Sequence, residues 1–450
     1  MKSLRISDIL AVCDGEFYGD TSVLDKQITS ITTDNRKATP NSLFASIVGQ
    51  RVDAHDFIPS AFQSGAICAI CEHKINGDYP YILVNSTTIA LGKIAKYYRS
   101  LFDIPFIGIT GSVGKTSTKE MLYSVLSQKY NIHKTNGNFN NQLGVPLTLF
   151  GLEEYHQIAI IEMGISDFGE MDYLSGIVRP DICVISNIGN CHLENLGDRD
   201  GVLKAKTEML NNMSPNGFVV LNGDDDKLAT VKSVNGKSPI FFGINQNNQY
   251  YAQNICGGGL NGISCTICTP NCKFDVNIPS IGNYMVLNTL SAVAVAQILG
   301  LSNSEIITGI QSYKTISGRS NLIKTDKYTI IDDCYNANPV SMKAGIDALC
   351  TFNGRKVCIL GDMKELGANE TGLHQEVGAY INTKNIDLLV TVGNLALNIN
   401  SMAGIDNKVH FDTLTNAIDN LSGLLLPNDV ILVKASNSMN FKQIVEFLKA

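Results

Sequence analysis

A glycine-rich loop between an apolar strand and a helix constrains this chain more than any other feature. Residues 108–121, GITGSVGKTSTKEM, follow the apolar run of residues 104–107 and continue into a segment with helical apolar spacing. Glycines in such a loop let backbone N–H groups approach phosphate oxygens, and the helix N-terminus favours negative charge. The loop therefore predicts a phosphate site within an α/β fold.

The loop residues fit distinct roles in binding a nucleotide. Lys115 would pair with the β and γ phosphates, and the Thr116 hydroxyl would ligate magnesium. The full P-loop spacing has another glycine five residues before Gly114, where this chain has Ile109. The position between strand and helix still favours phosphate binding over an ordinary turn. The predicted cradle consists of Gly111, Ser112, Val113, Gly114, Lys115, Thr116 and Ser117.

The length and composition limit the domain number and the class of partner. A chain of 450 residues predicts about three domains, and 44% hydrophobic with 17% charged residues is typical of a globular protein. The net charge of -7 argues against a nucleic-acid partner, because nucleic-acid binders carry a basic surplus. We find no secretory signal and no apolar run of 18 residues, so we expect a cytoplasmic chain without a membrane span. We expect a monomer.

The strand pattern predicts three α/β domains, over residues 1–103, 104–313 and 314–450. The first reads as mixed strand and helix. In the second, buried strands alternate with helix-length segments, which predicts a parallel sheet covered on both faces. The pattern then restarts and predicts a smaller, Rossmann-like domain. The apolar runs of the last two domains include QIAIIEMG, DICVISNIG, YTIIDDCYN, KVCILGDM and DVILVKAS.

Polar residues end these apolar runs, among them Glu162, Asp333 and Lys434. Ligands of open α/β sheets bind beyond the carboxyl ends of the strands. Two sheets that face each other would bring both sets of polar residues into one cleft. Glu162 could hold magnesium there directly or through water, and His192 could supply a nitrogen ligand. Lys204 and Lys206, by contrast, read as solvent-facing lysines of an amphipathic helix.

The twelve cysteines are scattered, which in a cytosolic chain indicates reduced thiols. Cys256, Cys265, Cys268 and Cys272 contain one C-x2-C step that could belong to a zinc site. The alternation of residues 262–268 as a strand points Cys268 away from Cys265, which favours core thiols over zinc.

Several motifs together resemble the Mur ligases, the ATP-dependent amide-bond-forming enzymes of peptidoglycan precursor synthesis. They are TGSVGKTS, NFNNQLGVPLTL, IIEMG, NIGNCHLENLG, KAKTEML, LNGDDD, SGRSN, DDCYNANPVSM and LGDMKELG. The last two resemble the family member that joins D-alanyl-D-alanine to UDP-N-acetylmuramoyl-tripeptide. The resemblance implies a nucleotide-sugar domain over residues 1–103, a central ATPase domain, and a C-terminal domain that binds the dipeptide.

The resemblance also implies roles for individual residues. Lys115 and Thr116 become the phosphate and first-magnesium groups, Glu162 and His192 lie at a second magnesium, and Lys206 carries a carbamate that ligates it. ATP would be contacted by Asn140, Asn141, Asn288, Arg319 and Asp333. The dipeptide would be contacted by Asn336, Asn338, Lys434 and Ser436, and the nucleotide sugar by Asp34, Asn35 and Arg36. Asn35 stands where the family has serine, and Ala435 where it has glycine.

Four alternatives stay open. The tripeptide-forming Mur ligase and folylpolyglutamate synthetase share the loop and the lysine. The former is expected to show an Asp-Tyr-Ala-His-like block where this chain has DDCYNANP, residues 332–339. A P-loop nucleotide switch would normally show an Asn-Lys-x-Asp motif, whereas Asn407-Lys408 is followed by Val409-His410. A structural interaction protein would not need so many polar strand ends.

Overall fold

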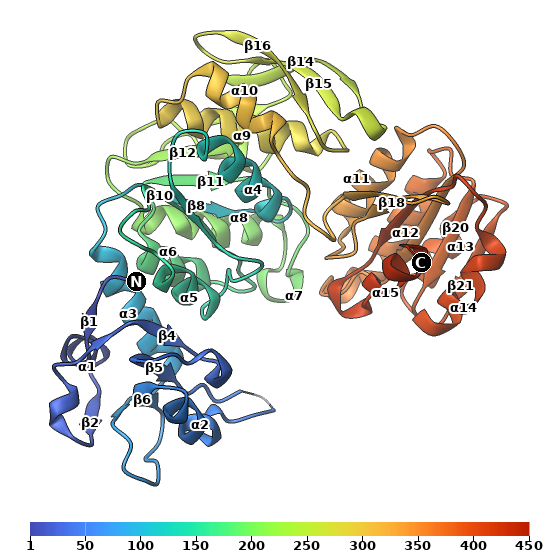
Figure 1. Ribbon diagram of the computed structural model, residues 1–450. Helices are drawn as coiled ribbons and strands as arrows, with labels where there is room; N and C mark the ends of the chain where they lie inside the picture. The colour runs from blue at the N-terminus through green and yellow to red at the C-terminus, as the bar shows by residue number, and fades with distance from the viewer. Residues whose placement is uncertain (50, 450) are drawn as a thin grey trace.

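The computed structural model describes residues 1–49 and 51–449. Its chain forms three successive α/β lobes, coloured blue, cyan to yellow, and orange to red in Figure 1. Each lobe has its own sheet, of five, nine and six strands, and a two-stranded ribbon, β1 (Leu4–Arg5) with β3 (Gln27–Ile28), lies near the N-terminus. The α/β fold with parallel sheets confirms the predicted fold class. No helix in the described ranges has the length and apolarity needed to cross a membrane.

The N-terminal sheet is mixed, with β2 antiparallel to β7 and the remaining pairs parallel. Its strand order is β2 (Glu16–Tyr18), β7 (Tyr81–Leu83), β6 (Ala66–Cys71), β5 (Ser42–Ala45), β4 (Ser30–Thr32). Its helices are α1 (Ile6–Cys13), α2 (Ile58–Gln63) and α3 (Thr87–Ser100).

The central sheet runs parallel from β9 to β14 and then turns antiparallel. Its order is β9 (Ile132–Lys134), β10 (Ile158–Glu162), β8 (Phe106–Thr110), β11 (Ile182–Ile185), β12 (Phe218–Asn222), β13 (Ile240–Gly243), β14 (Tyr250–Gly257), β15 (Ile263–Cys268), β16 (Lys273–Ile278). The predicted parallel sheet is thus confirmed only through β14. Strands β15 and β16 extend it as antiparallel neighbours, and a bulge breaks the register between Gln253 and Cys256.

Helices cover both faces of the central sheet, as its alternating apolar residues require. Ile107 and Ile109 of β8 pack under α4 (Lys115–Leu126), α9 (Tyr284–Ile298) and α10 (Asn303–Gln311), whereas Phe106 belongs to the core on the opposite face. That opposite face carries α5 (Gly144–Phe150), α6 (Glu170–Val178) and α8 (Arg199–Thr207), and the short α7 (Leu193–Leu196) follows β11.

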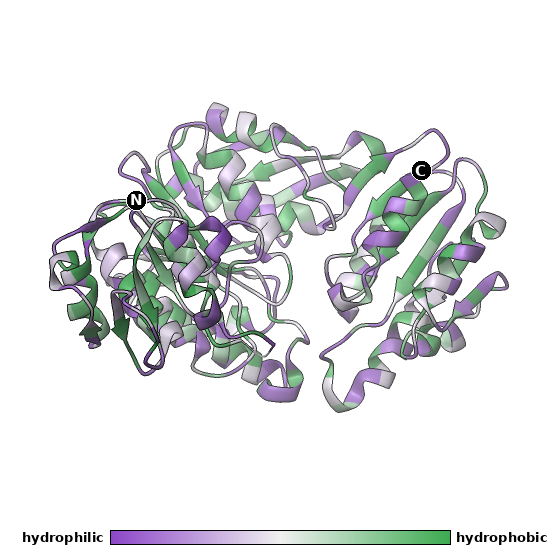
Figure 2. Cartoon of the chain, turned by 60° about the horizontal axis from the view of Figure 1, so that its bottom comes forward, coloured by the Kyte–Doolittle hydropathy of each residue, from purple (hydrophilic) through white to green (hydrophobic). Residues whose placement is uncertain are grey.

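The C-terminal sheet is parallel apart from its edge strand β17, which is antiparallel to β18. Its order is β17 (Asn321–Lys324), β18 (Thr329–Asp332), β22 (Val430–Lys434), β19 (Lys356–Gly361), β20 (Leu388–Val392), β21 (Lys408–Phe411). Helices α11 (Pro339–Cys350), α12 (Glu370–Ile381) and α13 (Leu397–Met402) cover one face, and α14 (Leu414–Leu424) and α15 (Lys442–Lys449) the other. Figure 2 shows the hydrophobic residues of this lobe concentrated in the strands.

Two contacts join the far end of the central lobe to the C-terminal lobe. Ile281, in the loop between β16 and α9, is 2% exposed and packs within the C-terminal hydrophobic core. The Gly259 N–H donates a hydrogen bond to Thr351 Oγ1 at 3.1 Å. The two lobes therefore meet beside the antiparallel extension, and a cleft opens between their strand ends.

Candidate active site

The glycine-rich loop joins β8 to α4, as the sequence predicts, and the end of β11 holds its shape. The Val113 N–H donates to Asn187 Oδ1 at 2.9 Å, and Ser186 Oγ donates to the Val113 carbonyl at 2.7 Å. Gly114 is the N-cap of α4 with φ +83°, a conformation that favours glycine. Because glycine has no side chain to cap the helix, the first N–H groups of α4 are available to an anion.

Lys115 follows the loop on the first turn of α4 and lines the cleft. Its Nζ donates to the Gly111 carbonyl at 2.8 Å. Burial is the main cause that lowers the pKa of this amine, and Glu162 acts in the opposite sense. The ammonium is therefore held over the loop by a backbone carbonyl, a contact that an anionic ligand could replace.

Glu162 ends β10 beside the loop and is 1% exposed. Its Oε1 accepts hydrogen bonds from Thr116 Oγ1 at 3.1 Å and Asn140 Nδ2 at 2.8 Å. Its Oε2 is buried without a hydrogen-bond partner among the described residues. A buried carboxylate oxygen in this state, next to a threonine hydroxyl, suits a hard divalent cation, because such ions take oxygen ligands.

Lys119, which the sequence reasoning missed, lies behind this carboxylate. It is 1% exposed, and its Nζ lies 3.6 Å from Glu162 Oε2 and 3.3 Å from Glu120 Oε1. It also donates to the Gly137 carbonyl at 3.3 Å, in the loop that carries Asn140. A spacing of four residues from Lys115 places both amines on one side of α4, and this spacing was the available signal.

Lys206 contradicts the expectation of a solvent-facing lysine. It is 1% exposed, whereas Lys204 is exposed. Burial, with a smaller effect of the Lys115 charge, lowers the pKa of Lys206 to about 8. The spacing Val202, Ala205, Met209 puts residue 206 on the apolar face of α8, so helical periodicity would have predicted its burial.

His192 precedes α7 in a left-handed conformation, φ +52°, and lines the cleft. Its Nδ1 lies 3.3 Å from Oε2 of Glu365, which belongs to the C-terminal lobe. Burial and the nearby Lys206 charge lower the pKa of His192, and the Glu365 charge partly offsets them. A neutral imidazole of this kind is the form that can ligate a metal.

The C-terminal side of the cleft is built from the ends of β18 and β22. Lys434 Nζ donates to Asp333 Oδ2 at 2.6 Å and to the Asn336 carbonyl at 3.0 Å. Asp333 Oδ1 accepts from the Ser320 N–H at 2.9 Å. The guanidinium of Arg319 lies 3.9 Å from the centre of the Tyr335 ring, a cation–π contact that the sequence did not predict.

Three predicted ligand asparagines line the cleft, but their side chains also support the fold. Asn338 Oδ1 caps α11 by accepting from the Ser341 N–H at 2.8 Å. Asn141 Oδ1 accepts from the Gly144 N–H at 2.9 Å at the start of α5. Asn288 Oδ1 accepts from Thr118 Oγ1 at 3.2 Å, which fixes it against α4.

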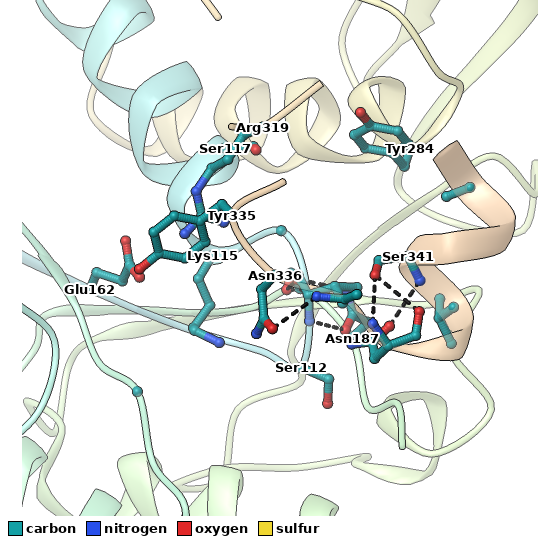
Figure 3. A pocket seen from close by; sticks show the side chains of 18 of the residues that line it. Ser112, Lys115, Ser117, Glu162, Asn187, Tyr284, Arg319, Tyr335, Asn336 and Ser341 are labelled. Carbon is teal, nitrogen blue, oxygen red and sulfur yellow. Dashed lines mark hydrogen bonds between the residues drawn. The ribbon is translucent and has the colours of Figure 1, made fainter. Parts of the chain in front are cut away.

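These groups surround one cavity of about 600 Å³ between the two lobes. Figure 3 shows Lys115, Glu162 and Asn187 of the central lobe with Arg319, Tyr335, Asn336 and Ser341 of the C-terminal lobe. The predicted residues that line it are Ser112, Val113, Gly114, Lys115, Ser117, Asn140, Asn141, Glu162, His192, Asn288, Arg319, Asp333, Asn336, Asn338 and Lys434.

The other predicted residues lie outside this lining. Gly111, Thr116 and Lys206 are buried next to it. Ser436 is buried, and its Oγ accepts from the Lys364 N–H at 2.9 Å. Asp34, Asn35 and Arg36 lie in the N-terminal lobe, where Arg36 Nε pairs with Asp34 Oδ1 at 2.9 Å and Asn35 Nδ2 donates to Ser60 Oγ at 2.8 Å.

Two groups of residues outside the cleft were candidates for a metal site: the cysteines of residues 256–272 and the group Asp53, His55 and His73. Neither has the arrangement of free ligand atoms that a metal site needs. Within residues 1–49 and 51–449, only Asp53, His55 and His73 bring three ligand atoms within 4.8 Å of one another, so the cysteines do not. His55 Nε2 accepts from the Glu72 N–H at 2.9 Å, so its single proton lies on Nδ1, toward Asp53 Oδ1 at 2.5 Å. Hydrogen bonds thus occupy both nitrogens of His55.

Comparison with known proteins gives the same family along the chain. The models for the Mur ligase family catalytic domain, the Mur ligase middle domain and the Mur ligase glutamate ligase domain match residues 27–101, 109–296 and 318–437. A UDP-N-acetylmuramoyl-tripeptide--D-alanyl-D-alanine ligase from Bacillus subtilis is 36% identical over 94% of this chain and 93% of its own length.

Solved structures agree with that relationship. MurF from Acinetobacter baumannii matches with a TM-score of 0.94 and 32% identity, over 100% of this chain and 99% of its own. MurF from Thermotoga maritima, solved in complex with ADP, matches with a TM-score of 0.85 and 28% identity, over 93% and 97%. Because the family models match most of its length and a relative is 36% identical over 94% of it, this chain belongs to the Mur ligase family.

Proposed function

We propose that this chain is an ATP-dependent ligase that joins D-alanyl-D-alanine to UDP-N-acetylmuramoyl-tripeptide in peptidoglycan precursor synthesis. The curated relatives that match nearly its full length carry this activity in their names, and ADP was bound to the Thermotoga relative. One observation carries the proposal: the phosphate loop and the Asp333–Lys434 pair face a common cavity. A nucleotide and a second substrate can therefore meet there.

The reaction proceeds in two displacements. The terminal carboxylate oxygen of the tripeptide attacks the γ phosphorus of ATP, which forms an acyl phosphate and breaks the bond to ADP. The dipeptide amine then attacks the acyl carbon, its nitrogen loses a proton, and inorganic phosphate leaves. Phosphoryl transfer needs positioning and neutralised charge, which the Lys115 ammonium, the N–H groups of α4 and the Arg319 guanidinium would supply.

We propose two magnesium ions. Thr116 and Glu162 are joined at 3.1 Å and would hold one ion. Glu162 Oε2, which accepts no hydrogen bond from the described residues, would be a further ligand. Glu162, His192 and Lys206 would hold the other. When bound, the ions neutralise phosphate charge that the chain alone leaves uncompensated.

Lys206 would serve that second site as a carbamate. A neutral amine attacks the carbon of carbon dioxide, forms an N–C bond and releases a proton, which turns a cation into an anionic oxygen ligand. With a pKa of about 8, roughly one Lys206 amine in ten is neutral at pH 7, far more than for an ordinary lysine. Burial next to the proposed ligands supports this assignment.

The three lobes would divide the substrates among them. Residues 1–103 would bind the nucleotide sugar, with Asp34, Asn35 and Arg36 as contacts. Residues 104–313 would bind ATP, with Asn140, Asn141 and Asn288 near the nucleotide. Residues 314–450 would bind the dipeptide through Asn336, Asn338, Lys434 and Ser436. We propose that the enzyme acts as a monomer in the cytoplasm, where its ATP is available.

Phosphate release from ATP tests the function directly. The purified chain should release phosphate only with UDP-N-acetylmuramoyl-tripeptide and D-alanyl-D-alanine together, and mass spectrometry should show the ligated product. Dipeptide and tetrapeptide forms of the nucleotide sugar serve as matched controls. Turnover with the dipeptide form and a single amino acid would instead identify a tripeptide-forming ligase. Phosphate release that needs no amine would contradict a ligase altogether.

A further inference from the structure

One contact in the cleft joins the two lobes directly at the proposed metal site. His192 lies at the start of α7 in the central lobe, and Glu365 lies between β19 and the turn at residues 367–369 in the C-terminal lobe. Their closest atoms, His192 Nδ1 and Glu365 Oε2, are 3.3 Å apart. The backbones also approach here, because a Cβ built on Gly367 would lie 3.5 Å from the Glu194 nitrogen.

Both residues have a left-handed backbone conformation, which is unfavourable for residues other than glycine. His192 has φ +52° and Glu365 has φ +63°. Such conformations persist where the surroundings determine them, and they gather at functional sites. Two of them face each other across one cleft, so the local chain on each side is shaped to bring these side chains together.

The Glu365 carboxylate has no obvious structural purpose. Its side chain is 71% exposed, and the His192 contact is the one ion pair recorded for it in the described ranges. The other carboxylates that line the cleft are already engaged: Glu162 with Thr116 and Asn140, and Asp333 with Lys434. Glu365 is thus placed to act on His192.

We propose that Glu365 is a positioning residue that orients His192 for the second magnesium ion. Its carboxylate, 3.3 Å from Nδ1, would accept the Nδ1–H of the imidazole when the metal binds, which would fix the tautomer and leave Nε2 bare for the metal. Carboxylates commonly hold metal-ligating histidines in this way. Because Glu365 comes from the C-terminal lobe, the second ion binds tightly only when that lobe is in place. The inference rests on the proposed function, since it assigns His192 to the metal.

Manganese binding measured by electron paramagnetic resonance tests the proposal without turnover. The full chain is titrated with Mn²⁺ in the presence of ADP, and the wild type should bind two ions. Glu365→Ala should lower the affinity for the second ion by about tenfold or more and leave the affinity for the first ion unchanged. Glu365→Gln keeps an acceptor oxygen for Nδ1–H and should retain most of the affinity.

Glu194 provides the matched control. It lies exposed on α7, two residues after His192, and within residues 1–49 and 51–449 its side chain makes no hydrogen bond. Glu194→Ala removes the same charge from the same neighbourhood and should bind both ions like the wild type. In a His192→Ala background, Glu365→Ala should have no further effect on the second ion.

Each remaining outcome would overturn the inference. Wild-type affinity for the second ion in Glu365→Ala would show that the carboxylate does not orient His192. Equal losses in the Gln and Ala variants would show that the charge, not the hydrogen bond, matters. If Glu365→Ala lowers the affinity for the second ion further in the His192→Ala background, the two residues act independently. A wild type that binds two ions but does not ligate would refute the proposed function alone.

Discussion

The two sides of the cleft differ in how their charged groups are satisfied. On the central side, Glu162 Oε2 accepts no hydrogen bond from any described residue and lies 3.6 Å from Lys119 Nζ, and the Lys115 ammonium bonds only a backbone carbonyl. On the C-terminal side, Asp333 and Lys434 neutralise each other at 2.6 Å. Glu162 Oε2 and the Lys115 ammonium therefore have spare hydrogen-bonding capacity for a charged ligand, whereas the Asp333–Lys434 pair must give up an internal bond to receive one.

This contrast suggests a division of labour. Unfilled capacity in a buried site is costly unless a ligand occupies it, which is typical of a binding centre for ions and phosphates. A buried pair that satisfies itself contributes mostly to the local structure until a ligand competes for it. We therefore expect substitutions on the central side to impair catalysis, and those on the C-terminal side to affect stability as well.

The largest effect is expected for Lys115→Ala and Glu162→Ala. Each removes a group aimed at phosphoryl charge or metal, so turnover should fall by about 10²-fold or more. Steady-state phosphate release measures it, and circular dichroism checks the fold. Lys129→Ala, an exposed lysine elsewhere in the same lobe, is the control. Near-normal turnover in a folded Lys115 or Glu162 variant would show that the central side of the cleft has no special role in catalysis.

Substitution of Lys206 should cause a similar loss of activity, which added carboxylic acids should partly restore. Lys206→Arg keeps the positive charge but cannot form a carbamate, so activity should fall by about 10²-fold. Lys206→Ala should be inactive too, and small carboxylic acids should restore part of its activity by supplying the missing oxygen. Lys204→Arg, two residues away and exposed, should resemble the wild type. Normal activity of Lys206→Arg would eliminate the carbamate.

Without its carbamate, Lys206 should lower the free energy of unfolding of the protein. Its pKa is lowered from 10.5 to about 8 by burial, so folding is penalised while both states are protonated, by about 3 kcal/mol below pH 8. The penalty disappears as pH rises from about 8 to 10.5, because only the unfolded state then holds the proton. Without carbon dioxide, Lys206→Met should raise the free energy of unfolding at pH 7 by up to that amount. Equal stability at both ends of this window would contradict burial of the charge.

On the C-terminal side, Lys434→Ala should destabilise the protein by about 3 kcal/mol, because it leaves the mostly buried Asp333 without its counter-charge. Urea denaturation measures the change. Arg36→Ala breaks a pair that is exposed in the N-terminal lobe, and the urea midpoint should hardly move. If Lys434→Ala is as stable as Arg36→Ala, Lys434 does not stabilise the fold through Asp333. Its ammonium would then be as available to a ligand as that of Lys115.

Asn338→Ala should show the smallest effect, a loss of about 1 kcal/mol, because it removes the cap of α11. Thermal unfolding detects it, and Asn338→Ser, which keeps a capping oxygen, should recover most of the loss. If Asn338→Ala changes the Michaelis constant for D-alanyl-D-alanine but not the melting temperature, the side chain serves the substrate rather than the helix.

The parts of the site that the sequence predicted are those with a local signature. The phosphate loop was predictable because its chemistry requires contiguous residues, and Glu162 because it ends a strand. The burial of Lys206 was missed although the helical period indicates it. Lys119 was missed although its spacing of four residues from Lys115 was an available signal. Glu365 could not be assigned, because its partner His192 lies far away in the sequence. Strand β14 was missed because its buried and exposed residues alternate irregularly. Strand β16 was also missed, although its polar and apolar residues alternate regularly and could have predicted it.

Ile281 has a consequence for how the protein unfolds. It belongs to the central lobe by sequence, yet its side chain completes the hydrophobic core of the C-terminal lobe. Fully burying an isoleucine contributes about 1.5 to 3 kcal/mol, which is a large share of a domain's net stability. A fragment cut from the chain at residue 314 would lack this side chain and expose the pocket it fills. We therefore expect the two lobes to unfold with some cooperativity, and a C-terminal fragment cut at residue 314 to be less stable than the same lobe in the full chain.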